Sequence, residues 1–191
     1  MTSIYKQQRE MVKRKVHDTA IRLFREKGYD RVSIDQITKT VGIAKGTFYN
    51  FYASKKDILM QWALGQFEAI DVQSGFSPDG TIRENMSRVI GIIVSAIEDQ
   101  GALFVSFLKE LIRGYKDASV QFDFVTIFSE VIRGSSDFST VAEDFGPKLQ
   151  VLNNALFLAI FDWFSTPEPA EPLKKHLEKT LSICLYGMMA R

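Results

Sequence analysis

The chain has 191 residues, of which 46% are hydrophobic and 25% are charged, the usual composition of a globular protein. The N-terminal sequence MTSIYKQQREMVKRK is too polar for a signal peptide, and no apolar run approaches the length of a membrane span. We therefore expect a cytoplasmic protein without membrane contact. The single cysteine, Cys184, excludes an intrachain disulfide and a cysteine-based metal cluster.

The charged residues are divided unevenly along the chain. Residues 1–60 contain 13 Lys and Arg against 6 Asp and Glu, whereas residues 61–191 contain 11 against 17. A basic first part joined to an acidic remainder favours a polyanionic partner for the first part alone. Chance clustering of surface charge is the alternative.

Apolar residues recur at helical spacing along nearly the whole chain, which predicts an all-α fold. In chain order, the expected helices cover about residues 6–27, 34–41, 45–53, 55–72, 81–99, 103–113, 119–133, 147–164 and 173–189.

Helix boundaries near the N-terminus have clear local signals. Gly28 and Gly42 are expected to end the first and second helices in the left-handed conformation. Ser33-Ile34-Asp35-Gln36 is a capping box that opens the second helix, and Ser54-Lys55-Lys56-Asp57 opens the fourth. Pro147 suits the first position of the eighth helix.

The first three helices, joined by tight glycine turns, have the organisation of a helix-turn-helix, in which the third helix enters the major groove. On the third helix, Phe48, Phe51 and Tyr52 fall on one side, where they can pack on the other two helices. The opposite side consists of small and polar residues, which are Gly46, Thr47, Tyr49 and Asn50. A helix that only faced water would more usually carry Glu and Lys pairs there.

Four segments, in this order and spacing, resemble the DNA-binding domain of tetracycline-repressor (TetR) type regulators: Phe24–Tyr29, Val32–Ile37, Val41–Tyr49 and Ser54–Leu59. The similarity covers about residues 11–60. It implies a three-helix helix-turn-helix domain in residues 1–54 and a larger helical domain for effector binding and dimerisation in residues 55–191. Ala44 departs from the family pattern, which often has a capping Ser or Thr there, and Phe51-Tyr52 reverses the common order of the two rings.

Roles in DNA binding follow from this resemblance together with side-chain chemistry. Tyr49 and Lys55 are expected to bind phosphates, Lys55 beside the free amides at the start of the fourth helix. The best base-reading candidates are Lys45, Thr47 and Asn50, since Asn pairs with adenine. Gly46 leaves room for DNA to come close, and Ser33 is expected to add a phosphate contact. Solvated or core-edge positions are the alternatives for Tyr49, Lys55 and Asn50.

The eighth and ninth helices are apolar almost all round, so each must pack on its own core and on something else. Pairing with their symmetry mates would form a four-helix interface, whereas central positions in a monomer are the alternative. The interface candidates are Leu152, Leu156, Ile160, Trp163, Leu177, Leu181 and Cys184.

The resemblance also implies a small-molecule pocket in the second domain. Its candidate residues are Trp62, Met86, Phe104, Phe107, Phe122, Phe128 and Phe157, together with the polar Asn153 inside an apolar stretch. Plain core packing is the alternative for each aromatic residue. The negative charge outside the first domain favours a neutral or cationic, apolar effector.

The predicted function is that of a transcriptional regulator, a repressor that binds double-stranded operator DNA as a C2 homodimer and is released by a small-molecule effector. The alternative is a DNA-binding protein of the same fold that acts without an effector. An enzyme is disfavoured because His17 and His176 lie on different predicted helices and no phosphate-binding glycine loop or metal-ligand spacing is present. No cofactor or metal is expected.

Overall fold

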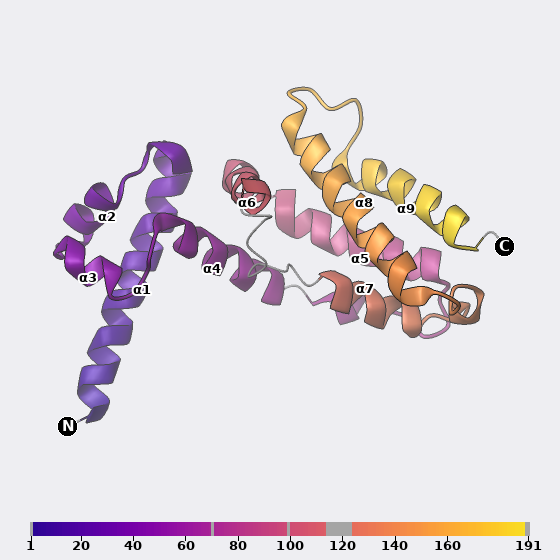
Figure 1. Ribbon diagram of the computed structural model, residues 1–191, viewed down its shortest axis with the longest axis horizontal. Helices are drawn as coiled ribbons and strands as arrows, with labels where there is room; N and C mark the ends of the chain where they lie inside the picture. Colours follow the sequence, from indigo (N-terminus) through magenta and orange to yellow (C-terminus); the bar gives the residue numbers. More distant parts are fainter. Residues whose placement is uncertain (1, 70, 99, 114–123, 190–191) are drawn as a thin grey trace. The chain divides into compact units, whose positions relative to one another are not determined.

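The computed structural model describes residues 2–69, 71–98, 100–113 and 124–189, and the regular elements within them are all helices (Figure 1). The predicted all-α fold is confirmed. The chain forms two compact units, one of Met1–Ala69 with Gln100–Arg113 and one of Ile70–Asp99 with Gly114–Arg191. These structural units part at Ala69, whereas the sequence placed a functional boundary at residue 54.

Five α-helices and one 3₁₀ turn form the first unit: α1 (Thr2–Lys27), η1 (Tyr29–Arg31), α2 (Ile34–Val41), α3 (Lys45–Tyr49), α4 (Lys55–Glu68) and α6 (Gly101–Arg113). The long α1 is central to it, because α2, α4, α6 and η1 all pack against this helix. Val16, Ala20 and Phe24 form its buried stripe and are at most 2% exposed. Burial of the Phe24 side chain alone contributes about 1.5 to 3 kcal/mol.

The predicted boundaries of α2 are confirmed in atomic detail. The Gln36 amide donates to Ser33 Oγ at 3.2 Å, and the Ser33 amide donates to Gln36 Oε1 at 2.9 Å, which completes the capping box. Gly42 ends the helix with φ +81°, and its amide donates to the Thr38 carbonyl at 2.9 Å. Glycine adopts this left-handed conformation without strain, so the turn into α3 can be tight.

Three helices of the first unit differ in length from the prediction. α1 begins at Thr2, before the expected start near Lys6, and the apolar residues of its first turn, Ile4 and Tyr5, are exposed and lie outside the buried stripe. α3 ends at Tyr49, since the amides of Phe51 and Tyr52 both donate to the Phe48 carbonyl, at 2.9 and 3.0 Å, and the chain turns there. α4 ends at Glu68 rather than near residue 72.

The second unit contains α5 (Ile82–Glu98), α7 (Phe124–Arg133), α8 (Phe145–Ser165) and α9 (Leu173–Met189), with the 3₁₀ turns η2 (Val72–Gly75) and η3 (Phe138–Thr140). α8 packs along α9, α5 contacts α7 and α9, and α7 contacts α8. α9 has its predicted bounds. α8 begins two residues before Pro147, which still lies in the first turn, where an amide has no partner inside the helix. Residues 119–123 of the predicted seventh helix lie outside the described ranges.

In the described part of the chain, no single helix is long and apolar enough to cross a bilayer. The bent pair of α5 and residues 101–111 reaches that length and apolarity only when its two helices are taken together.

Candidate nucleic-acid interface

The apolar side of α3 holds this short helix on the first unit. Phe48 is fully buried and Tyr52 is 5% exposed, with their ring centroids 5.9 Å apart, whereas Phe51 is only half-buried. Tyr52 is therefore the deeper ring of the reversed pair. The other side of α3 presents the predicted DNA-contacting residues: Lys45, Gly46, Tyr49 and Asn50 are exposed, and Thr47 is half-buried.

The fold does not require a glycine at position 46, where Gly46 lies. Its φ is not positive, and a Cβ built on it would meet nothing within 4 Å. Glycine inside a helix costs about 1 kcal/mol relative to alanine. The fold of the free chain therefore gives no reason for a glycine at this position.

The start of α3 has no side-chain cap, since Ala44 makes no capping hydrogen bond. Lys45 instead reaches back to α2, where its Nζ lies 2.8 Å from Asp35 Oδ1. This hydrogen bond raises the pKa of Lys45. Because both groups are exposed, the ion pair contributes little to stability, and Lys45 can exchange Asp35 for another anion.

Tyr49, Asn50 and Ser33 keep polar atoms accessible near α3. The Tyr49 side chain is 50% exposed and meets the Phe48 ring edge-on at 5.6 Å between ring centroids. Asn50 ends α3 and is exposed. The Ser33 hydroxyl accepts a hydrogen bond in the capping box, so its own proton stays available to a phosphate.

Lys55 is hydrogen-bonded within its own unit. Its ammonium donates to the carbonyls of Tyr29 at 2.8 Å, Val32 at 3.0 Å and Asp30 at 3.4 Å, and lies 4.3 Å from the Tyr29 ring centroid. Partial burial lowers the pKa of Lys55, while Asp30 and Glu110 act in the opposite direction. An ammonium has three donors, so these carbonyls engage all of them. Lys55 ties the turn η1 to the start of α4, and a phosphate would have to displace that network.

Two basic residues beside α3 escaped the sequence prediction. The Arg9 guanidinium lies 5.8 Å from the centre of the Phe51 ring, and Lys13 Nζ lies 5.8 Å from that of Tyr52. Both belong to α1, which the sequence analysis treated only as a support. The signal that could have found them is the spacing of Lys6, Arg9 and Lys13, which places all three on one side of a helix.

The effector candidates do not gather at one place. Trp62, Phe104 and Phe107 are buried and belong to the first unit, whereas Met86, Phe128, Asn153 and Phe157 belong to the second. Met86 is fully buried in the core of the second unit, and Phe122 lies outside the described residues.

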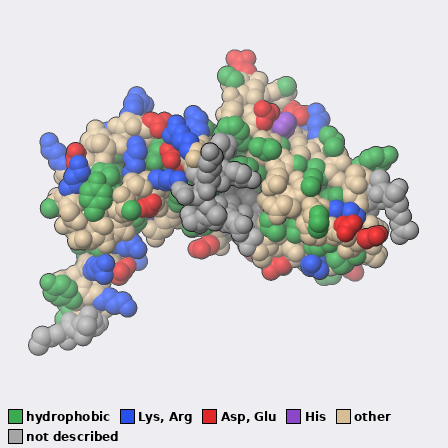
Figure 2. Space-filling view, in the orientation of Figure 1, with side chains coloured by type: hydrophobic (Ala, Val, Ile, Leu, Met, Phe, Trp, Pro, Cys, Tyr) green, Lys and Arg blue, Asp and Glu red, His purple; other side chains and the backbone are tan. Residues whose placement is uncertain are grey.

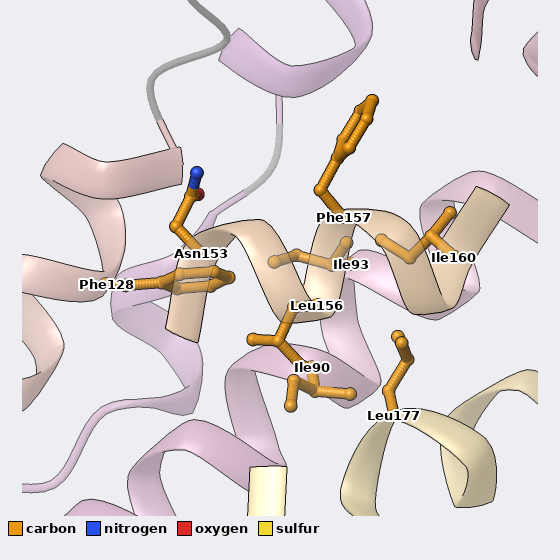
Figure 3. A pocket seen from close by; sticks show the side chains of 8 residues that line it. All are labelled: Ile90, Ile93, Phe128, Asn153, Leu156, Phe157, Ile160 and Leu177. Carbon is orange, nitrogen blue, oxygen red and sulfur yellow. The ribbon is translucent and has the colours of Figure 1, made fainter. Parts of the chain in front are cut away.

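Three candidates line a small hollow in the second unit: Phe128, Asn153 and Phe157, with Ile90, Ile93, Leu156, Ile160 and Leu177 (Figure 3). Its volume is about 10 Å³, roughly the room for one water molecule. Figure 3 shows Leu156 pointing toward Ile90 and Leu177, while Asn153 and Phe157 project from the other side of α8. Asn153 Oδ1 is buried without a hydrogen-bond partner in the described part of the chain.

Five of the dimer candidates face the core of their own unit. Leu152, Leu156, Ile160, Leu177 and Leu181 are at most 5% exposed. Trp163 is half-buried and donates from Nε1 to the Glu171 carbonyl at 2.7 Å, and burial raises the pKa of the half-buried Cys184 thiol. The apolar side chains that α8 and α9 expose are different ones: Val151, Leu158, Ile183 and Tyr186, which are 59 to 80% exposed.

Comparisons with known proteins agree with this arrangement. Residues 16–61 match the family model of bacterial regulatory proteins of the tetR family. A negative transcriptional regulator of the biofilm operon icaADBC, IcaR of Staphylococcus aureus (strain Newman), is 48% identical over 50 residues. That match spans 26% of this chain and 27% of the relative, so the chain shares only about a quarter of the relative's length.

Two solved structures share the fold over nearly the whole chain. FadR of Thermus thermophilus, a TetR-family transcriptional repressor in complex with lauroyl-CoA, matches 94% of this chain and 96% of its own, with 21% identity and a TM-score of 0.62. A TetR transcriptional regulator from Rhodococcus sp. RHA1 matches 96% of this chain and 98% of its own, with 17% identity and a TM-score of 0.63. Residues 16–61 thus match the model of bacterial regulatory proteins of the tetR family, and the chain as a whole has the fold of these solved regulators.

Proposed function

We propose that this protein is a cytoplasmic transcriptional repressor that binds operator DNA as a homodimer and leaves it when a small apolar effector binds. In this proposal α3 reads the major groove through Lys45, Thr47 and Asn50, and Tyr49 and Ser33 fix its position on the phosphates. The protein has no catalytic role.

The exposed side of α3 carries the proposal. It is small and polar, and it includes a glycine that the fold does not need. The tetR-family match over residues 16–61 includes α3, which supports a role for this helix in DNA binding. The IcaR match, which lies in a negative regulator, supports repression rather than activation.

The operator is found by mapping the sites that the protein occupies on the DNA of its own genome, followed by binding to the recovered duplex. Asn50→Ala and Thr47→Ala should each lose about 1 to 3 kcal/mol on this operator and little on mixed-sequence DNA. Ser95→Ala, an exposed substitution on α5, serves as the control. If both α3 variants kept the preference for the operator, α3 would not be the reading helix.

Dimerisation is proposed to use the exposed apolar side chains Val151, Leu158, Ile183 and Tyr186 of α8 and α9. One helix-turn-helix covers one half-site, so specific binding needs two of them at a fixed spacing. Exposed apolar residues on neighbouring helices are the usual mark of a contact surface. The operator should accordingly contain inverted half-sites.

The effector site is proposed at the hollow between α5, α7, α8 and α9. Its lining is apolar except for Asn153, whose unpaired oxygen can accept a hydrogen bond. The space is too small for a ligand as it stands, so binding has to move side chains apart and can release DNA only by favouring that altered conformation. The structure of FadR with lauroyl-CoA suggests an acyl chain as the first probe.

A thermal-shift titration with lauroyl-CoA and with neutral dodecanol tests this part. A ligand that binds the folded state raises Tm, by an amount set by its concentration relative to Kd. Stabilisation together with release of operator DNA supports a repressor with an effector. The second candidate, a DNA-binding protein without an effector, is favoured if a wide panel of apolar compounds leaves both Tm and DNA binding unchanged.

A further inference from the structure

The N-terminal half of α1 stands clear of the packed core of its unit. Every side chain from Ile4 to Met11 is exposed, and the first buried residue of the helix is Val16. At 1.5 Å per residue, about 20 Å of helix precedes Val16. Figure 1 shows this end of α1 extending beyond α2 and α3 of the same unit, to the end marked N.

One side of this protruding helix is basic and faces the end of α3. Lys6, Arg9 and Lys13 follow one another at intervals of three and four residues, so they share a face. Arg9 and Lys13 each lie 5.8 Å from an aromatic ring that directly follows α3, Phe51 and Tyr52 respectively. The basic stripe, defined here as Lys6, Arg9 and Lys13, therefore begins beside the recognition helix and runs away from it along α1.

The stripe has an acidic neighbour, Glu10, four residues after Lys6 and three before Lys13, but forms no direct ion pair in the described part of the chain. None of its three cations takes part in an ion pair there, in contrast to Arg22 with Glu26 and Lys45 with Asp35. α1 has no acidic residue in its first turn, so the positive end of the helix dipole adds to the same charge. Figure 2 shows Lys and Arg side chains along this protruding part of the first unit.

We infer that the basic stripe is a second DNA-contacting surface, which binds the phosphate backbone next to the groove that α3 enters. The inference rests on the proposed DNA binding by α3. From Lys6 to Lys13 the stripe is about 10 Å long, the length of about three nucleotide steps at 3.4 Å per step along one strand. Lysine and arginine on phosphates contribute affinity and salt dependence but carry no sequence information, so the stripe strengthens binding to any duplex.

The test compares two triple variants of the full-length protein. In Lys6→Gln/Arg9→Gln/Lys13→Gln the stripe loses its charge while glutamine preserves helix propensity. The control, Lys109→Gln/Lys174→Gln/Lys175→Gln, removes the same charge from exposed positions on α6 and α9. Circular dichroism of both variants checks that helix content is unchanged.

Binding to a labelled mixed-sequence duplex is then measured by fluorescence anisotropy over a series of KCl concentrations. The slope of log K against log salt should fall in magnitude by about 2 to 3 per bound protomer for the stripe variant and stay at the wild-type value for the control. Equal slopes for the stripe variant and the control would overturn the inference. The inference would also be overturned if the stripe substitutions abolished binding to vesicles of anionic phospholipid but left the DNA slope unchanged. Failure of the wild-type protein to bind any duplex would instead overturn the proposed function.

Discussion

The two compact units differ in how clearly their side chains indicate a function. In the first unit, α3 exposes Gly46, for which the fold offers no reason, and the basic stripe of α1 takes part in no ion pair among the described residues. In the second unit, most conspicuous apolar residues are explained by the core that they fill, as Leu152 and Leu156 are. A residue that the fold does not need is better evidence of function than one that it buries.

The largest expected effect separates two leucines that are neighbours on α8. Leu156 is 3% exposed and Leu158 is 59% exposed. An aspartate at Leu156 would bury an unpaired charge, so Leu156→Asp should lower the free energy of unfolding by several kcal/mol. Leu158→Asp should leave the subunit folded but weaken the proposed dimer. Thermal unfolding and sedimentation measure the two effects, and a Leu158→Asp variant that remained dimeric would place the interface elsewhere.

Lys55→Ala should have the next largest effect. It tests whether Lys55 binds DNA or stabilises the fold of the first unit. Lys55→Ala removes the ammonium that donates to the carbonyls of Tyr29 and Val32, which should cost about 1 to 3 kcal/mol of folding stability. The salt slope of DNA binding should not change. Lys56→Ala is the matched control. A slope that fell by about 1 with unchanged Tm would make Lys55 a phosphate contact, as its sequence position predicts.

Gly46→Ala should separate stability from binding. The added methyl group meets nothing in the free protein, so the helix should gain up to about 1 kcal/mol. On operator DNA the same methyl group should crowd the contact and cost about 1 to 3 kcal/mol of binding free energy. Chemical unfolding and anisotropy titration provide the two values. If affinity and stability rose together, no partner approaches Gly46.

Asn153→Leu should have the smallest effect. It tests the one polar residue in the apolar lining of the hollow described for the second unit. It removes the buried oxygen that lacks a partner, so the free protein should gain about 1 kcal/mol of stability. The thermal shift produced by a ligand that donates a hydrogen bond, such as dodecanol, should shrink. A destabilised variant would indicate that Asn153 has a structural role instead.

The sequence predicts best what is local. The capping box of Ser33 and Gln36 and the cap formed by Ser54 and Asp57 both join residues three apart, and both are present. The environment of Lys55 could not be foreseen, because its three acceptors lie 23 to 26 residues earlier in the chain. The side of α8 that faces the core could not be predicted either, because a helix that is apolar almost all round has no periodicity to distinguish its sides.

The first unit is also discontinuous, which limits how it can be handled as a module. The chain passes from one unit to the other near residues 70, 100 and 114, and α6 returns to pack on α1, α4 and η1. A fragment ending at Ala69 would lack α6 and the hydrogen bond from Arg25 to Gln100. Exchanging DNA-binding parts between this protein and a relative would therefore require two segments to be transplanted together, residues 1–69 and 100–113. During synthesis, the first unit cannot be completed until α5, which belongs to the other unit, has left the ribosome.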